Sequence, residues 1–307
     1  MQDNTTVPQE WWITEQGLKT NMMLPGNIPI ATISDVIVPA IFSRAPGLVA
    51  LQSTRNGGVS EGVYSTMNLG NNTEDSRESV QQNMMRLCQR AFIDGNRMVS
   101  SIQVHGTEVL LAVKPGKYHG YDAFITNQEN LFLSVFTADC HPILLYDPRH
   151  NASGAVHAGW KGAAGEIVTK TIHAMQKSFG SIPAECLAYT GTGISAEAYE
   201  VGREVASAFP EDCSRRSLLS PGNEKYQLNL GMVIYRQLLN AGIPALSIEQ
   251  SPFCSFYESR LFYSHRRDHG RTGRMVSLIG FNSKHPSTKT SCHKSHRVHG
   301  PDEISPP

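Results

Sequence analysis

The sequence of 307 residues has no excess of either charge, since it holds 27 lysines and arginines against 27 aspartates and glutamates. A balanced charge gives no support to non-specific nucleic-acid binding or to attraction to a membrane surface, so neither partner is expected. The sequence also lacks an apolar run approaching the ~20 residues of a membrane span. Its polar beginning, MQDNTTVPQEWW, has no basic stretch followed by an apolar core, so no secretory signal is expected.

Paired cysteine spacings are missing as well. The six cysteines are scattered along the chain, at Cys88, Cys140, Cys186, Cys213, Cys254 and Cys292. Scattered cysteines are typical of free thiols in a cytosolic protein and not of a disulfide scaffold. We therefore expect a cytoplasmic protein, and its apolar content of 40% is large enough to build a sizeable core.

Apolar runs and helical periodicities alternate along the chain, which predicts an α/β fold. Helices are expected within residues 75–95, 162–180, 195–210 and 228–242. Strands are expected within residues 48–60, 98–106, 122–127, 131–139, 142–148, 154–160, 186–194, 245–252 and 274–281. The two kinds of element are interleaved throughout, so we expect mixed β-sheets sandwiched between helices.

The pattern predicts a single layered domain over residues 35–282, after an N-terminal extension, residues 1–34, that is partly ordered. Residues 283–307 have no aromatic and almost no aliphatic side chain, so this segment is predicted to be disordered. The segment carries four histidines. It is either a metal-scavenging tail or an adventitious extension, and the second interpretation is the simpler one.

Three metal-binding residue types stand at the ends of predicted strands. His105 ends one in QVHG, Cys140 ends one in TADC, and His157 ends one in AVHAGW. If these strands share a sheet, the three side chains converge at one edge, and two imidazoles with one thiolate are a set that Zn²⁺ accepts while keeping a fourth position open. Singly, a cysteine at a buried strand end is more often simply packed, and a histidine there is more often a structural hydrogen-bonding residue. The gaps of 35 and 17 residues are too wide for a compact zinc finger.

Cys140 is flanked by two further polar residues, Asp139 and His141. Asp139 is a candidate acid, base or ligand orienter if the backbone turns there, and otherwise it caps a turn. His141 is adjacent to Cys140, and neighbours on a regular strand point to opposite faces, so we expect His141 behind the ligands or at the surface. A hydrolase with Cys140 as nucleophile and His157 as base is a minor alternative.

Several cations stand where an anion could be held. Arg55 lies on the glycine turn of STRNGGVS, and Lys161 precedes a predicted helix in AGWKGAAGE. FYSHRRDHGRTGR adds Arg266 and Arg267, with two further arginines behind them. Guanidinium groups suit phosphate because they donate two parallel hydrogen bonds, although some of these side chains are expected to be solvated.

In order, the blocks STRNGGVS, QVHG, TADCHPILLYD, AVHAGWKG, GTGISAEAYEVG and FYSHRRDHGRTGRM resemble the signature blocks of the laccase-domain family. Its members are also called YfiH-like or polyphenol-oxidase-like proteins and are now understood as purine nucleoside phosphorylases. The resemblance covers about residues 35–282 and is carried most specifically by TADC and HAGWKG. It implies a layered α/β domain and a zinc ion held by His105, Cys140 and His157.

The resemblance also implies small-molecule substrates: phosphorolysis of adenosine, inosine, guanosine and methylthioadenosine, and hydrolytic deamination of adenosine. We expect Arg55, Lys161, Arg266 and Arg267 to hold phosphate, and a monomer or weak dimer. The alternative is a Cu²⁺-dependent, laccase-like oxidation of phenols, because His141 and the histidine-rich tail could recruit further metal. Against this alternative, the chain has no pair of His-x-His motifs from which a multi-copper cluster could be built. A non-catalytic metal protein is a third hypothesis.

Overall fold

The structure is a computed structural model that describes residues 35–220, 222 and 224–282. The predictions made for residues 1–34 and 283–307 lie outside this described part. Within it, strands and helices are interleaved as the sequence predicts, and the class is mixed α/β. No helix in the described ranges is long and apolar enough to cross a membrane.

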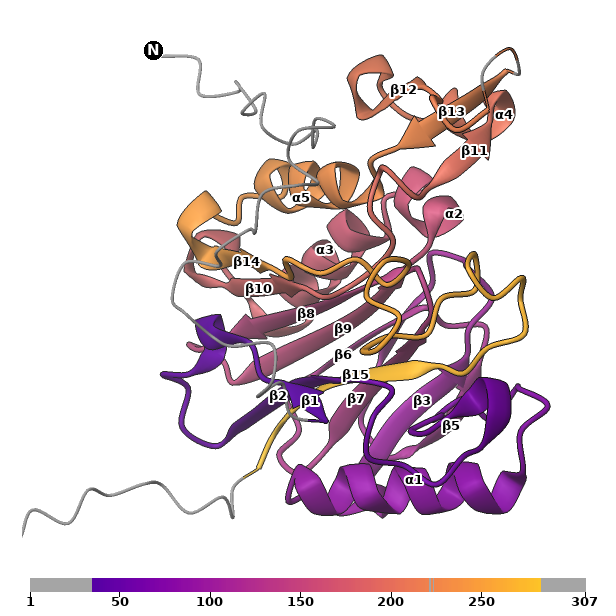
Figure 1. Ribbon diagram of the computed structural model, residues 1–307. Coiled ribbons are helices and arrows are strands. Elements are labelled where there is room, and N and C mark those ends of the chain that lie inside the picture. The colour runs from indigo at the N-terminus through magenta and orange to yellow at the C-terminus, as the bar shows by residue number, and fades with distance from the viewer. Residues whose placement is uncertain (1–34, 221, 223, 283–307) are drawn as a thin grey trace, which may run out of the picture.

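Two six-stranded mixed sheets form the centre of the molecule (Figure 1). The first sheet has the order β1 (Val36–Ile37), β2 (Leu48–Ser53), β15 (Met275–Phe281), β7 (Phe132–Thr137), β3 (Met98–Ile102) and β5 (Gly116–His119). The second sheet has the order β14 (Ile248–Gln250), β10 (Leu187–Thr190), β8 (His141–Asp147), β9 (Ala152–Ala158), β6 (Ala123–Thr126) and β4 (Val109–Leu111). In the first sheet β3 runs parallel to both its neighbours, whereas β15 runs antiparallel to both of its own. In the second sheet β10 runs parallel to β14 and antiparallel to β8.

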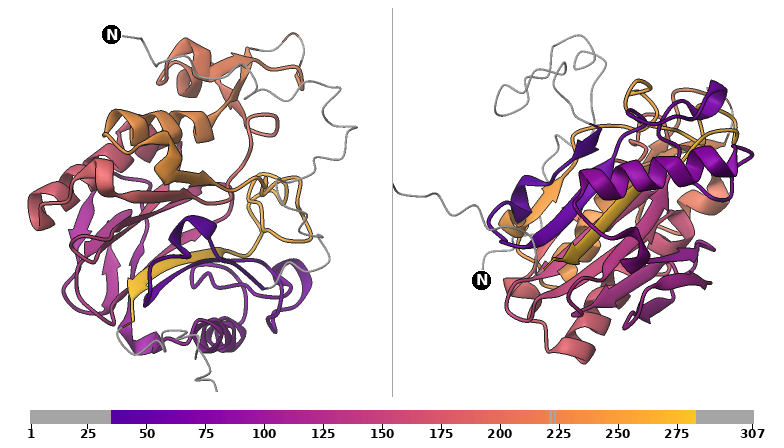
Figure 2. Two further views of the ribbon diagram at one scale, coloured as in Figure 1. Left: turned by 90° about the vertical axis from the view of Figure 1, so that its left-hand side faces the viewer. Right: turned by 90° about the horizontal axis from the view of Figure 1, so that it is seen from below.

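The two sheets pack face to face, as the left view of Figure 2 shows, with β7 of the first against β9 of the second. Apolar side chains from both sheets fill the space between them, among them Phe124, Leu133, Leu144 and Ala155. These four side chains are fully buried. Burial on both faces explains why these strands appear in the sequence as nearly continuous apolar runs.

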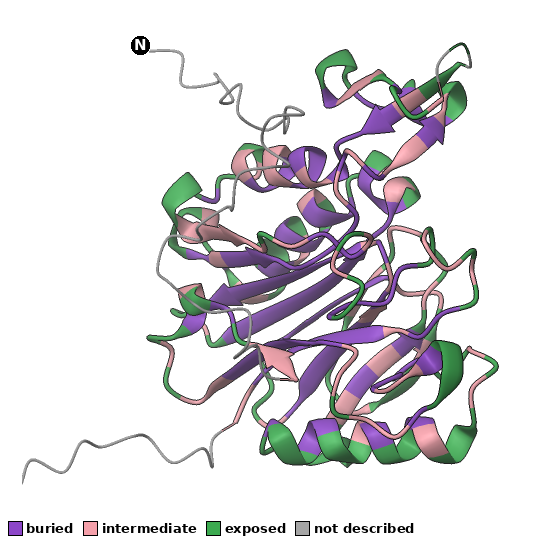
Figure 3. Ribbon diagram, in the orientation of Figure 1, coloured by how far each residue is buried: buried purple, intermediate pink, exposed green. Residues whose placement is uncertain are grey.

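Helices cover the outer faces of this pair of sheets. Helix α1 (Arg77–Arg90) is capped by Ser76, whose hydroxyl accepts a hydrogen bond from the backbone N–H of Ser79, and its buried stripe packs on the first sheet. Helices α3 (Ile167–Phe179) and α5 (Leu230–Asn240) pack on the outer face of the second sheet. The result is a four-layer arrangement in which the purple strands of Figure 3 lie between helices with green outer faces.

The helix predicted within residues 162–180 is in fact two helices. Helix α2 (Trp160–Ala164) ends before Glu166, which has a left-handed backbone (φ 60°), and α3 begins at the next residue. Helix α3 ends, as predicted, at Gly180, whose φ of 74° glycine adopts without strain.

The helix predicted over residues 195–210 is wrong for most of its length. A short strand, β11 (Glu200–Gly202), stands there and is followed by a single turn of helix, α4 (Arg203–Ala206). With β13 (Lys225–Leu228) and β12 (Ser214–Arg216), β11 forms a small third sheet that the sequence analysis missed. Long-range pairing of β11 with β13 has overridden the local helical pattern.

Candidate functional site

His105, Cys140 and His157 come from both large sheets, so their side chains converge without their strands sharing one sheet. His105 follows β3 of the first sheet, and His157 lies near the end of β9 in the second. Cys140 occupies the turn that carries the chain from β7 of the first sheet to β8 of the second. The three residues therefore meet where the ends of two facing sheets come together.

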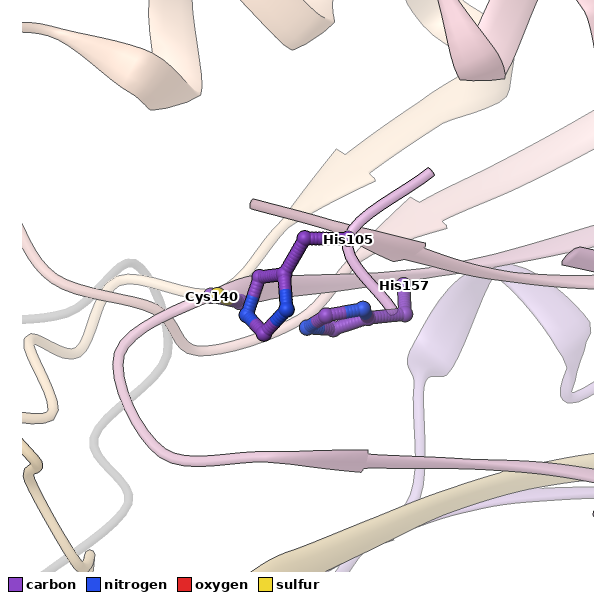
Figure 4. A group of neighbouring side chains, drawn as sticks. All are labelled: His105, Cys140 and His157. Carbon is purple, nitrogen blue, oxygen red and sulfur yellow. The ribbon is translucent and has the colours of Figure 1, made fainter. Parts of the chain in front are cut away.

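The three side chains form a compact cluster (Figure 4). Their ligand atoms all lie within 4.8 Å of one another. The two imidazole rings meet edge to face, with centroids 4.8 Å apart and planes inclined by 76°. In the described part of the chain, this is the one group of three or more histidine, cysteine or acidic side chains close enough to hold a metal ion.

Gly159 leaves room for this cluster. A Cβ atom at this position would lie 2.9 Å from Cδ2 of His105 and 3.0 Å from Sγ of Cys140. Both distances are shorter than a normal non-bonded contact, so a larger residue would displace two of the three donors. This close approach explains the glycine of the HAGW block.

Asp122, which was not predicted from the sequence, holds the side chain of His157 and the backbone of His105. Its carboxylate lies 2.8 Å from Nδ1 of His157. It also accepts hydrogen bonds from the backbone N–H groups of Val104, His105 and Gly106, at 3.1, 3.0 and 2.7 Å. Asp122 is fully buried and immediately precedes β6. Because Nδ1 of His157 is engaged, Nε2 of that ring is the nitrogen left to face the cluster.

The backbone beside the cluster is held in an unusual conformation. His105 has a φ of 59° and Asp139 a φ of 86°, in the left-handed region that residues other than glycine seldom occupy. Such positions cost about 1–3 kcal/mol and persist where the surroundings impose them. The hydrogen bonds from the 104–106 backbone to Asp122 supply that constraint at His105.

The cluster is electrostatically coupled. Burial alone would raise the pKa of Cys140, but the adjacent His157 and His105 lower it to about 6. Burial alone would lower the pKa of His157, but the Cys140 thiolate and Asp122 raise it to about 9. Near neutral pH, the metal-free cluster therefore holds a thiolate beside an imidazolium.

The cluster opens into a cavity of about 510 Å³. His105, Cys140 and His157 line one part of it, and Tyr199, Arg266 and Arg274 line others. A cavity of this size accommodates a small organic molecule together with a further anion. Two imidazoles and a thiolate beside such a cavity fit a metal ion with an open coordination position, either zinc or copper.

Residues 49–282 match the model of the family described as multi-copper polyphenol oxidoreductase laccase. The chain belongs to this family. Relatives similar to this chain are named purine nucleoside phosphorylases. A purine nucleoside phosphorylase of Deinococcus radiodurans is 36% identical over 259 residues, which are 84% of this chain and 95% of the relative. One of Bacteroides thetaiotaomicron is 33% identical over 240 residues, which are 74% of this chain and 89% of the relative.

Solved structures of the laccase-like family share the fold. YlmD from Geobacillus stearothermophilus superposes with a TM-score of 0.74 at 31% identity and covers 80% of this chain and 94% of its own. The YfiH protein from Bacillus licheniformis gives a TM-score of 0.73 at 31% identity, over 76% of this chain and 93% of its own. The resemblance noted in the sequence and the expected fold class are thus confirmed.

Asp139 lines the cavity beside Cys140, but both of its carboxylate oxygens are already engaged. Oδ1 accepts the hydroxyl of Ser255 at 2.7 Å, and Oδ2 accepts the backbone N–H of Arg266 at 2.6 Å. Asp139 therefore ties the long connection between β14 and β15 to the cluster. His141 is buried and not at the surface: its Nδ1 lies 3.2 Å from the carbonyl oxygen of Gly191.

Three of the four cations expected to hold phosphate, Arg55, Lys161 and Arg267, lie outside the cavity lining. Arg55 donates Nε to the carbonyl of Ser65 and Nη1 to that of Ser259, both at 2.9 Å. Lys161 is exposed, and it lies within α2 and not before it, with Nζ 5.7 Å from the ring centroid of Trp160. Since α2 has only five residues, the anion site expected at its N-terminus is not supported.

The arginines near the C-terminal end of the domain divide into structural and cavity-lining groups. The guanidinium group of Arg267 donates hydrogen bonds to three backbone carbonyls and to the carboxylate of Asp268, so it holds the surrounding loop together. Arg266, one of the predicted phosphate-binding residues, lines the cavity, and so does Arg274, which was not among them.

One signal in the sequence could have identified Asp122. It is a single acidic residue immediately before an entirely buried apolar strand, Ala123–Thr126. A lone charge at such a place needs a partner. Nothing in the sequence names His157 as that partner, because β6 and β9 pair only in the folded sheet.

Proposed function

We propose that this member of the family is a zinc-dependent purine nucleoside phosphorylase. It would convert adenosine, inosine, guanosine or methylthioadenosine with phosphate to the free base and a ribose 1-phosphate, and would deaminate adenosine as a second activity. The carrying observation is the cluster of His105, Cys140 and His157 beside a 510 Å³ cavity, in a chain whose curated relatives are named purine nucleoside phosphorylases.

Two imidazoles and a thiolate are donors that suit zinc. When bound, zinc would act as a Lewis acid and would lower the pKa of a water molecule, which deamination at purine C6 requires. The protein's own contribution is orientation: Asp122 fixes His157 and the His105 backbone, and Gly159 leaves the space that the donors need. Such fixed donors hold a substrate with little reorganisation.

Phosphorolysis exchanges one bond at the ribose for another. A phosphate oxygen forms a bond to C1′ as the bond from C1′ to purine N9 breaks, and the purine keeps the bonding electron pair. The base then takes up a proton. The reaction therefore requires cations for phosphate, and the cavity lining supplies Lys117, Arg266 and Arg274. We propose that Asp139 positions Arg266 and does not act as the acid, because both its oxygens accept hydrogen bonds.

Oxidation of phenols with copper is the second candidate, since the family description names multi-copper polyphenol oxidoreductases. Copper suits the same donors. Four-electron reduction of O₂ in blue laccases, however, uses several coppers, and the described residues contain one cluster of three donors. His141, which could have recruited a further copper, is buried and does not belong to that cluster, and its Nδ1 lies 3.2 Å from the carbonyl oxygen of Gly191.

The proposal is tested with zinc-loaded, copper-free protein and adenosine, with and without phosphate. We expect adenine and ribose 1-phosphate only in the presence of phosphate, and slower release of inosine in either case. Phenol oxidation is measured in parallel with zinc-loaded and copper-loaded protein. The proposal is wrong if zinc-loaded protein oxidises phenols faster than it cleaves adenosine, or if adenosine is not cleaved.

A further inference from the structure

We propose that inorganic phosphate binds in the cavity on the guanidinium groups of Arg266 and Arg274, and not on Arg55, Lys161 or Arg267. This inference rests on the proposed phosphorolysis, which needs a phosphate site beside the nucleoside. It goes further because it assigns the anion to two side chains that are fixed in advance and keep unused donors.

Arg274 is held in place before any ligand arrives. Its backbone N–H donates to Oδ1 of Asn68 at 2.9 Å, and its Nη1 donates to its neighbours' carbonyls, those of Thr272 at 2.8 Å and Gly273 at 2.9 Å. The stem of the side chain lies against Gly70, where a Cβ would be 2.7 Å from Cγ of Arg274. Within the described residues, Nε and Nη2 of Arg274 have no hydrogen-bond partner, so two donors remain for a ligand.

Arg266 is also oriented by its surroundings. Its backbone N–H donates to Asp139, its Nη1 donates to the carbonyl of Glu200 at 2.6 Å, and its guanidinium carbon lies 5.3 Å from the ring centroid of Tyr199. As with Arg274, no side-chain ion pair to a carboxylate is formed in the described part of the chain. A guanidinium that is ordered without a carboxylate partner keeps its charge available to an anion.

The charge balance of the cavity favours a dianion. Three cationic side chains, Lys117, Arg266 and Arg274, line it against one carboxylate, that of Asp139. This carboxylate is already bonded to the Ser255 hydroxyl and the Arg266 backbone. A cavity with net positive charge raises the local concentration of phosphate and lowers the energetic cost of burying it.

Arg55, Lys161 and Arg267 differ from Arg266 and Arg274 in their position and in their contacts. None of them lines the cavity. Arg55 and Arg267 donate to backbone carbonyls, and Lys161 is exposed on α2. Arg55 and Lys161 are therefore matched controls, since each is a cation from a neighbouring sequence block and can be changed without touching the cavity.

The test measures the binding of inorganic phosphate by titration calorimetry, on zinc-loaded full-length protein without nucleoside. Arg274→Met and Arg266→Met remove one guanidinium each, and Arg55→Met and Lys161→Met are the controls. We expect each cavity variant to bind phosphate about ten- to a hundred-fold more weakly, as loss of a charge-assisted contact implies, and both controls to bind as wild type does. Arg274→Lys, which keeps the charge and loses the fork, should fall between.

Thermal melts decide whether a variant is folded. The inference is overturned if folded Arg274→Met and Arg266→Met bind phosphate as tightly as the wild type, if Arg55→Met or Lys161→Met loses as much, or if the wild type binds no phosphate. Should phosphate bind as expected while adenosine is not cleaved, the proposed function falls and the anion site stands. If Arg274→Met does not fold, phosphate binding by Arg266→Met is compared with that of the wild type and of the two controls.

Discussion

Nδ1 of His157 lies 2.8 Å from Oδ1 of Asp122, and both side chains are buried. The same carboxylate accepts the backbone N–H of His105. One side chain thus orients two proposed metal ligands that come from different sheets. A carboxylate behind a ligating histidine fixes the ring and its tautomer, which makes the site ready for the metal.

We predict that Asp122→Asn binds zinc about 10–100-fold more weakly, the range expected when such a supporting partner is lost. The amide places an NH₂ group where a carboxylate oxygen now accepts the N–H groups of Val104 and Gly106. Affinity is measured by competition with a chromophoric chelator.

The matched control is Asp147→Asn. Asp147 is also buried and pairs with Nδ1 of a histidine, His150, at 2.7 Å, but it does not line the cavity. We expect this control to lose stability and keep its zinc affinity. Unchanged zinc binding by folded Asp122→Asn would show that Asp122 has no role in positioning the ligands.

Gly159→Ala should lose zinc binding while the protein stays folded. The added methyl would stand about 3 Å from both His105 and Cys140, so the two donors must move apart. The check is metal content after purification together with the melting temperature. A variant that retains one equivalent of zinc would mean that the cluster is wider or more adaptable than the structure indicates.

In metal-free protein, iodoacetamide should modify Cys140 first. Its pKa of about 6 makes it a thiolate at pH 7, and the rate should fall as the pH is lowered through 6 because the thiol is then protonated. Burial raises the pKa of Cys186 to about 12 and of Cys213 to about 11, so those thiols should stay unmodified.

Peptide mass spectrometry identifies the modified residue, and added zinc should protect it. Modification of Cys186 or Cys213 at the rate of Cys140 would contradict the electrostatics derived for the cluster.

Cys140→Ala should abolish nucleoside turnover and change the free energy of unfolding by about 1 kcal/mol or less. A metal site at the ends of two sheets is not needed for the core of a chain of this length, unlike the site of a small zinc finger. Activity and thermal melts are measured on the same preparation. Phosphorolysis by metal-free Cys140→Ala would show that the cluster is not catalytic.

Much of the fold is visible in the sequence because buried strands are continuous apolar runs. The strands of both sheet centres and the helix stripe from Val80 to Leu87 agree with the expected elements. The segment 195–210 was misjudged because its helical pattern is weaker than the pairing of β11 with β13. Such pairing between distant segments is not contained in local periodicity.

The site was predictable in its residue types and not in its architecture. Turn residues after three apolar runs marked His105, Cys140 and His157, and the structure brings them together. Their origin in two sheets, and the role of Asp122, depend on tertiary packing. The direction of an arginine side chain likewise depends on which carbonyls it meets, which is why the sequence alone does not distinguish Arg267 from Arg274.

The central claim is that these three side chains hold one metal ion beside the cavity. Crystals of protein supplied with zinc, with data collected on both sides of the zinc absorption edge, test it most directly. The account predicts one anomalous peak within about 2.5 Å of Nε2 of His157, of Sγ of Cys140 and of one ring nitrogen of His105. No peak at that position in zinc-replete crystals, or a peak only elsewhere, would contradict it.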